Sequence, residues 1–157
     1  YCSNEEAKEN LKKQAVKYNV NSSRLIFAKK QPLKKHLSRQ KCADLFLDTS
    51  LYSAGATAWI ALSMGLPIIT ISGKSYTSRM SGSLLNALGL TELITDSIEA
   101  YKNKAYELAT NKSYLNSIKD KLEKLKRNSD IFNSNTFTKQ LESKYEQLIK
   151  QNLSILK

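Results

Sequence analysis

Two short apolar runs constrain the fold of this chain more than any other feature of its sequence. Residues 43–48 read ADLFLD, and residues 66–72 read LPIITIS, a run rich in β-branched residues. Between them, TAWIALSMG has a helix-forming composition and ends at Gly65, a predicted left-handed cap. Short strands that are apolar on both faces and alternate with helices pair in parallel beneath those helices. The pattern therefore predicts an α/β fold, a Rossmann-like parallel sheet with covering helices.

Segments on both sides extend this alternation. A helix is predicted over residues 4–18, where acids occupy the first turn and apolar residues recur at helical spacing. Residues 24–28, RLIFA, follow the turn-prone NVNSS and are predicted to form a buried strand. Pro32 opens a predicted helix through LKKHLSRQ. After Gly73 a helical stretch runs to Gly89, and TELIT follows as a brief extended piece.

Helical signals dominate the chain from Ser97 onward. Aromatic and aliphatic residues recur there at spacings of three and four, which predicts packing stripes rather than ligand contacts. The stripe residues are Tyr101, Ala105 and Leu108 in the first part and Phe137, Leu141, Tyr145 and Leu148 in the last. Because no repeat or linker interrupts the sequence, we predict a single domain over residues 1–157 that ends in a helical segment.

The formal net charge of +11 raises the question of nucleic-acid binding. Almost all of the positive charge is lysine, spread from Lys8 to Lys157 and mixed with acidic residues along predicted helices. We interpret these lysines as solvated helix faces. A patch for nucleic acid or an anionic membrane, centred between Lys102 and Lys126, is the alternative.

Few residues of this chain are suited to metal binding or disulfide formation. The sequence has two cysteines, Cys2 and Cys42, and one histidine, so neither a zinc site nor a disulfide framework is predicted. A reducing, cytoplasmic location fits that composition. No apolar run approaches the roughly twenty residues that span a bilayer, so we predict no membrane segment and no signal peptide.

The segment after Asp48 carries a predicted anion site. In parallel sheets, ligands bind outside the carboxyl ends of the strands, where helix amino termini present free N–H groups. Small residues form the loop there, and Thr57 stands where the next helix begins. The helix dipole favours negative charge at that point by roughly 0.3–1 kcal/mol. Two interpretations stay open, that Thr57 caps its helix or that it donates to a phosphate.

His36 and Arg39 form a second constellation. They are three residues apart in a predicted helix and therefore lie on one face. An imidazole offers a flat surface for stacking, and a guanidinium meets carbonyl acceptors, so the pair suits a nucleobase such as uracil. A plain surface pair explains the same spacing.

Several segments, in order and without large gaps, resemble a known enzyme family. They are the ADLFLDT strand, the G-LP-IT step, the SR-SGSLL-ALGL helix and the NSNTFTKQLESKY ending. Together they cover about Asn10 to Tyr145. In these segments the chain resembles the carboxyl-terminal lobe of O-linked N-acetylglucosamine transferases and their SPINDLY-like bacterial relatives.

The resemblance implies the carboxyl-terminal half of a GT-B glycosyltransferase. Such enzymes invert the anomeric centre and move a sugar, here N-acetylglucosamine, from a UDP-sugar to Ser or Thr hydroxyls of an acceptor protein, with no metal or other cofactor. The amino-terminal lobe, which holds the acceptor and catalytic groups, is absent from this chain, so we assign no catalytic residue. The implied donor-binding residues are Gln31 and His36 at the uracil, Arg39 beside them, and Gly55, Ala56 and Thr57 at the diphosphate.

Three features depart from the family's pattern. Where the family commonly has His-Thr-Thr in the diphosphate loop, this chain has Gly55, Ala56 and Thr57. Ile60 replaces an acid that grips the donor ribose, and Leu33 stands where some relatives have a lysine. Each lost polar contact weakens donor binding by about 1 kcal/mol. A degenerate, noncatalytic interaction module is therefore a second hypothesis, and a basic nucleic-acid-binding domain is a third.

Overall fold

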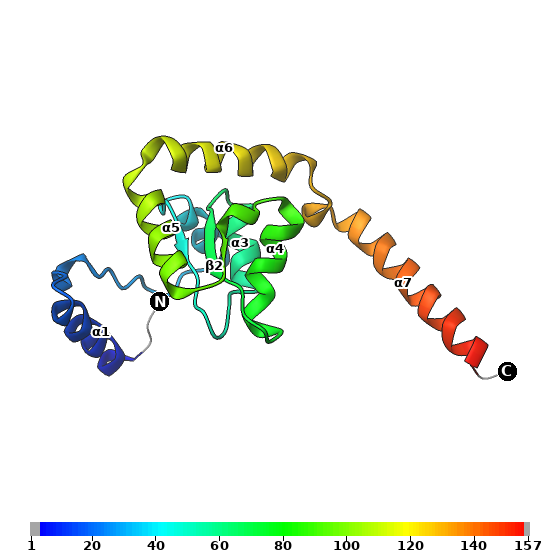
Figure 1. Ribbon diagram of the computed structural model, residues 1–157, viewed down its shortest axis with the longest axis horizontal. Coiled ribbons are helices and arrows are strands. Elements are labelled where there is room, and N and C mark those ends of the chain that lie inside the picture. The colour runs from blue at the N-terminus through cyan, green and yellow to red at the C-terminus, as the bar shows by residue number, and fades with distance from the viewer. Residues whose placement is uncertain (1–3, 156–157) are drawn as a thin grey trace. The chain divides into compact units, whose positions relative to one another are not determined.

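The computed structural model describes residues 4–155 and the side chains up to residue 152 (Figure 1). Contacts between Cα atoms divide the chain into two compact units, Tyr1–Ser38 and Arg39–Lys157. The single domain expected from the sequence stays a prediction. None of the described helices is both long enough and apolar enough to cross a bilayer.

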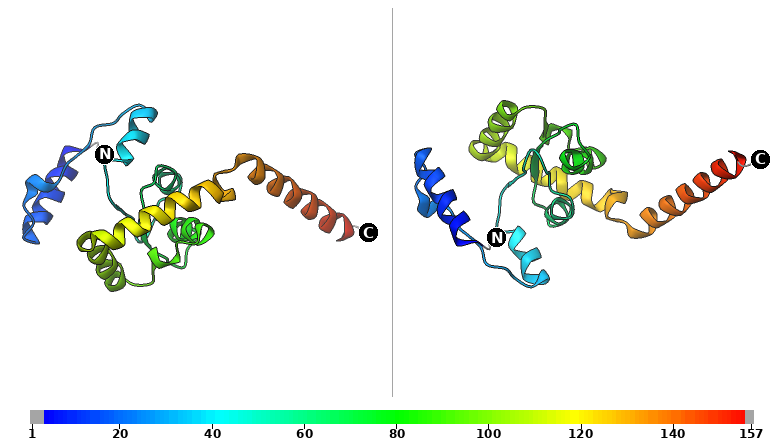
Figure 2. Two further views of the ribbon diagram at one scale, coloured as in Figure 1. Left: turned by 90° about the horizontal axis from the view of Figure 1, so that it is seen from above. Right: turned by 90° about the horizontal axis from the view of Figure 1, so that it is seen from below.

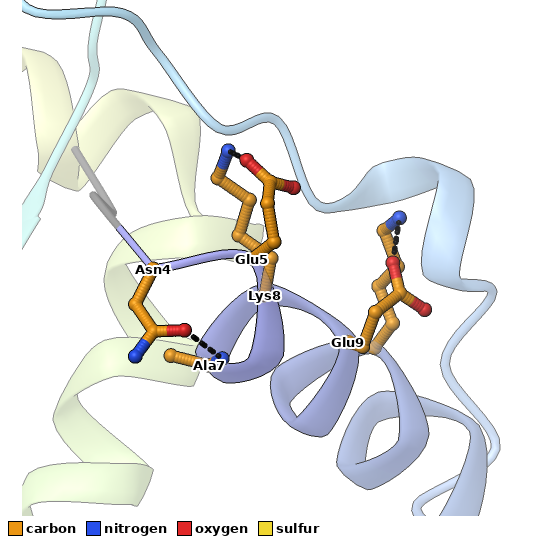
Figure 3. A network of polar contacts seen from close by, with 6 residues as sticks. Asn4, Glu5, Ala7, Lys8 and Glu9 are labelled. Atoms are coloured by element: carbon orange, nitrogen blue, oxygen red, sulfur yellow. Dashed lines mark hydrogen bonds and ion pairs between the residues drawn. The ribbon is translucent and has the colours of Figure 1, made fainter.

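The first unit begins with helix α1, Glu5–Lys17, which confirms the helix predicted over residues 4–18. Asn4 caps it, because the Asn4 side chain accepts a hydrogen bond from the Ala7 N–H at 3.3 Å. Figure 3 shows this cap together with the exposed ion pairs Glu5–Lys8 and Glu9–Lys12. Exposed pairs of this kind contribute little, so the cap is the clearer reason why the helix starts there.

The strand predicted over residues 24–28 is wrong. A 3-10 turn, η1 at Ser22–Arg24, occupies its beginning, and the Asn21 side chain fixes that turn by accepting from the Ser23 N–H at 2.9 Å. Ile26 is 90% exposed. A strand apolar on both faces needs paired neighbours, and the described part of this unit contains none. The predicted helix after Pro32 is confirmed as α2, Leu33–Gln40.

The second unit contains a parallel sheet of three strands in the order β1-β2-β3. The strands are β1 at Phe46–Leu47, β2 at Ile68–Ile71 and β3 at Ile94–Thr95. Phe46 pairs with Ile68, and Thr70 pairs with Ile94. The α/β fold with a Rossmann-like parallel sheet is therefore confirmed, although ADLFLD contributes only two strand residues.

Helices cover both faces of the central strand β2. Helices α3, Ala56–Ser63, and α4, Met80–Leu88, lie on one side of β2, and α5, Ile98–Thr110, lies on the other (Figure 1). Helix α6, Lys112–Asn128, contacts both α5 and α4. Their buried leucine and isoleucine side chains form one core with β2, as burial of apolar surface requires. The fully buried members include Leu62, Ile68, Leu85, Leu93, Leu108 and Leu122.

Short 3-10 turns join several of these elements. They are η2 at Thr77–Arg79, η3 at Thr91–Leu93 and η4 at Asp130–Phe132. The first leads directly into α4, and the second leads into β3. Gly65 and Gly89, which follow α3 and α4, both adopt positive φ angles, so the left-handed cap predicted at Gly65 is confirmed.

Helix α7, Ser134–Ile155, follows η4, and both views of Figure 2 show α6 and α7 as separate helices with a turn between them. The packing stripe predicted on α5 is confirmed at Leu108, which is fully buried. The stripe predicted on α7 is wrong for this chain, because Phe137, Leu141, Tyr145 and Leu148 are all exposed. The spacing of apolar residues marks a face suited to burial, but no described element covers that face.

Candidate functional site

Asp48 follows β1 directly and organises the loop that leads to α3. Its side chain is nearly buried, with 7% of the residue exposed. Oδ1 accepts hydrogen bonds from the backbone N–H groups of Thr49 at 2.9 Å and Ala54 at 2.8 Å. Oδ2 accepts from the Thr70 hydroxyl of β2 at 2.7 Å. The carboxylate thus joins both ends of the loop to the central strand.

Tyr101 of α5 adds a fourth contact to the same residue. Its hydroxyl donates to the Asp48 carbonyl oxygen at 2.9 Å. Burial raises the pKa of Tyr101, and the nearby negative charge of Asp48 raises it further. The main chain and the side chain of Asp48 are therefore both held from outside the loop.

Ser53 ties the outer part of the loop to η2 and α4. Its N–H and its hydroxyl both donate to the Thr77 carbonyl oxygen, at 3.0 Å and 2.7 Å. The Ser81 N–H donates to Ser53 Oγ at 3.3 Å, and the Ser81 hydroxyl donates to the Ala54 carbonyl oxygen at 2.7 Å. Ser53 and Ser81 are both completely buried. These bonds fix the path of the chain just before α3 begins.

The amino terminus of α3 is open. Gly55 is its N-cap residue, and no side chain among the described residues caps the helix. Ala56 and Thr57, the first two helical residues, are exposed. Thr57 lies two positions beyond the N-cap, so the interpretation in which its hydroxyl caps the helix is wrong. The first N–H groups of α3 have no partner within their own helix.

Two cavities flank this helix terminus and share residues with it. One has a volume of about 480 Å³ and the other about 410 Å³. The first is lined by residues that include Asp48, Thr49, Tyr52, Ser53, Ala56 and Thr57. The second is lined by residues that include Trp59, Tyr76, Arg79, Met80 and Ser83. Gly55 and Ala56 belong to both, so the start of α3 lies between the two cavities.

The Met80 side chain lies close to Gly55. A Cβ atom on Gly55 would lie 2.5 Å from Met80 Cε and 3.3 Å from Met80 Sδ. Both atoms lie at the far end of a flexible side chain, so a shift of Met80 would make room for a side chain at residue 55. The Met80 side chain thus lies over the position of a side chain at residue 55.

The residues of the predicted donor site fall in both units of the chain. Gly55, Ala56 and Thr57 meet at the start of α3, as the sequence predicts. Gln31 is exposed and precedes α2, which carries His36 and Arg39, both half-buried. Because Gln31 and His36 belong to the first unit, their roles at the uracil stay predictions, as does that of Arg39.

The sequence did not single out Asp48, Ser53 or Ser81 as residues that order the loop. Their polarity could have indicated this role. A polar residue within or next to an apolar run is buried only when it is hydrogen-bonded. Among the described residues, no group of three His, Cys, Asp or Glu side chains is arranged to hold a metal ion. Cys42 is an exposed free thiol, and Cys2 lies outside the described residues.

Comparisons with known proteins agree on one family. Residues 4–141 match the family described as Glycosyl transferase family 41. The chain is 27% identical over 146 residues to a UDP-N-acetylglucosamine--peptide N-acetylglucosaminyltransferase of Caenorhabditis elegans, covering 93% of this chain and 13% of that protein. It is 32% identical over 132 residues to the probable enzyme SEC of Arabidopsis thaliana, covering 83% of this chain and 14% of that protein.

A solved structure shows the same arrangement of elements. A mutant of the Thermobaculum terrenum O-GlcNAc transferase aligns with a TM-score of 0.83 and 28% sequence identity. The alignment covers 92% of this chain and 28% of that chain. This chain therefore spans a small part of the length of the relatives it matches.

Proposed function

Because this chain belongs to glycosyl transferase family 41, we propose that it forms the donor-binding part of a protein O-glycosyltransferase. The transferred sugar is N-acetylglucosamine, the donor is its UDP conjugate, and the acceptors are Ser or Thr hydroxyls of a protein. The names of the relatives support this substrate pair. The remainder of the enzyme supplies the acceptor site and the catalytic groups, as the other lobe of a GT-B pair.

One observation carries the proposal, the open amino terminus of α3 at the carboxyl edge of the sheet. Gly55 provides no cap, and Ala56 and Thr57 leave the first amides accessible. Such a terminus binds phosphate through its free N–H groups and its dipole. Bond cleavage puts negative charge on the departing diphosphate, and fixed N–H donors stabilise that charge more than they stabilise the bound donor.

The chemistry that this chain contributes is binding and orientation of the donor. Inverting transfer needs the donor and the acceptor held in line, which requires two walls of a cleft. We propose that this chain forms the donor-binding side of the cleft. In this proposal the uracil contacts Gln31, His36 and Arg39, and the diphosphate contacts Gly55, Ala56 and Thr57. The proposed enzyme works in the cytoplasm and uses no metal. The 157-residue chain by itself is not expected to catalyse sugar transfer.

Calorimetric titration with UDP tests the proposal. The enzyme that contains this chain is expected to bind UDP, and Thr57→Val is expected to weaken binding up to about tenfold, because one hydroxyl contact is lost. Thr138→Val, on the exposed helix α7, is the matched control and leaves binding unchanged. Absence of heat at millimolar UDP would contradict the proposal.

The degenerate, noncatalytic module is the second candidate, and Ile60 favours it. Ile60 lies one turn after Thr57 in α3, where the resemblance implies an acid that holds the ribose. Ile60→Asp separates the two candidates. Sugar transfer to a Ser-containing acceptor by the unmodified enzyme rules out degeneracy, whereas donor affinity or transfer that arises only in the Ile60→Asp variant supports it.

A further inference from the structure

Asp48 is an unusual residue to find beside an anion site. Its carboxylate is nearly buried and accepts from three neutral donors, the Thr49 N–H, the Ala54 N–H and the Thr70 hydroxyl. It also lines the 480 Å³ cavity at the start of α3. A negative charge in that place repels a bound diphosphate. Its presence therefore needs a reason other than attraction to the ligand.

The hydrogen bonds supply that reason. A single oxygen, Oδ1, accepts from residues at both ends of the loop, and Ala54 is six residues from Asp48. This closes the loop into a ring that ends two residues before α3 begins at Ala56. The hydrogen bond of the Ala54 N–H is therefore the last contact of the Asp48 carboxylate before the first amides of α3.

The ring is anchored to buried residues of the sheet. The Thr70 hydroxyl holds Oδ2 from β2, and the Thr70 carbonyl oxygen accepts from the Thr95 hydroxyl of β3 at 2.9 Å. The Tyr101 hydroxyl holds the Asp48 carbonyl oxygen from α5. Thr70 is completely buried and Thr95 nearly so. The sheet thus holds the Asp48 carboxylate through Thr70, and α5 holds the Asp48 main chain through Tyr101.

We propose that Asp48 is a positioning residue for the diphosphate, which orients the first N–H groups of α3 by holding the Ala54 N–H on its carboxylate. This inference rests on the proposed function and extends it to a residue that does not touch the donor. A preorganised terminus gains affinity because binding does not have to order the loop. In this proposal, the diphosphate affinity gained from the ordered loop exceeds the affinity lost to repulsion by the Asp48 carboxylate.

Two substitutions of Asp48 separate geometry from charge. Asp48→Asn keeps an oxygen for the Ala54 N–H and removes the charge, so UDP affinity is expected to stay the same or rise. Asp48→Ala removes the acceptor, so UDP affinity is expected to fall about tenfold, the loss that accompanies one charge-assisted hydrogen bond. Asp44→Ala is the matched control, because Asp44 is exposed and pairs with Lys119 instead.

Comparison with uridine distinguishes positioning from simple support of the fold. Uridine lacks the diphosphate, so its affinity is expected to be equal in the wild type and the Asp48→Ala variant. An equal loss of uridine and UDP affinity would mean that Asp48 only stabilises the fold and would overturn the proposal. An unchanged UDP affinity in Asp48→Ala would overturn it as well.

Hydrogen exchange in the ligand-free chain gives a readout that does not depend on UDP binding. Exchange at the Ala54 amide is expected to accelerate in Asp48→Ala and to stay slow in Asp48→Asn. Should Asp48→Ala fail to fold, Thr70→Val provides the milder change, with faster Ala54 exchange and a smaller loss of UDP affinity expected. If the wild type bound no UDP, the proposed function would fail, and Ala54 exchange alone would decide the role of Asp48 in the loop.

Discussion

Tyr101 shows how one side chain connects a helix to the site. It lies in α5, 53 residues after Asp48, and donates its hydroxyl to the Asp48 carbonyl oxygen. Burial and the charge of Asp48 both raise the pKa of Tyr101 above its ordinary value of 10.0. The folded state therefore holds the phenolic proton more tightly than the unfolded state does.

This shift predicts a loss of stability in alkaline solution. The contribution of Tyr101 is fully present below the unfolded pKa and is lost as the pH rises through the raised folded pKa. As the pH rises above the ordinary tyrosine pKa of 10.0, the free energy of unfolding of the wild type is expected to fall more steeply than that of Tyr101→Phe. Urea denaturation at each pH measures the free energy of unfolding. Tyr106→Phe is the control, because Tyr106 is exposed. Parallel curves for the wild type and Tyr101→Phe would contradict the assignment.

The site was predictable only in part, because contacts between residues far apart in the sequence leave no local pattern. The loop of small residues after Asp48 and the helix start after it are local features, and α3 begins at Ala56, one residue before the predicted Thr57. The partners of Asp48 are 22 residues away at Thr70 and 53 residues away at Tyr101. No local pattern relates residues so far apart. The contact between Gly55 and Met80 was missed for the same reason.

Helix ends provide a test at the scale of elements. Gly65 and Gly89 adopt φ angles of +81° and +72°, a left-handed backbone conformation that glycine takes without the strain a side chain would add. A Cβ on Gly89 would meet nothing within 4 Å, whereas one on Gly65 would meet Glu123 Oε1 of α6. Glu123 is half-exposed and pairs with Lys126, so its carboxylate has room to move.

Gly65→Ala and Gly89→Ala are expected to destabilise the chain by similar amounts, about 1 kcal/mol each. The backbone conformation accounts for both losses, and displacement of Glu123 adds only a few tenths of a kcal/mol, in the range of an exposed ion pair. The free energy of unfolding in urea measures the difference between the two variants. A Gly65→Ala loss several kcal/mol larger would show that Glu123 is held in place.

Element type was predictable where a local pattern and tertiary packing agree. The helices and the strand at Ile68–Ile71 follow from apolar periodicity and from β-branched residues that the core buries. Residues 24–28 have strand-like composition, but no described strand in their unit pairs with them. The stripe on α7 is periodic yet exposed. Composition thus predicts what a segment is able to bury, and its neighbours decide whether burial occurs.

At the scale of the whole molecule, the net charge of +11 is distributed rather than concentrated. Several lysines on α5 and α6 pair with acidic side chains. The pairs are Lys104–Glu107, Lys119–Asp44, Lys121–Glu92 and Lys126–Glu123. Lysines engaged in this way are poorly placed to release counterions from a phosphate backbone.

We therefore expect no specific DNA binding by the Lys-rich helices. In a gel-shift titration at low salt, the chain is expected to leave duplex DNA unshifted at micromolar protein. The same titration at rising salt is the control, because binding through lysines weakens steeply as salt increases. A shift at low salt that disappears on salt addition would support the nucleic-acid hypothesis instead.

The central claim is that the first amides of α3 bind the diphosphate of a UDP-sugar, and amide chemical shifts of the 157-residue chain test it most directly. On addition of UDP, the largest changes are expected at Ala56, Thr57 and Ala58, with no comparable change in α6. Changes confined to the lysines of α6, or no change at the start of α3 at saturating UDP, would contradict the claim.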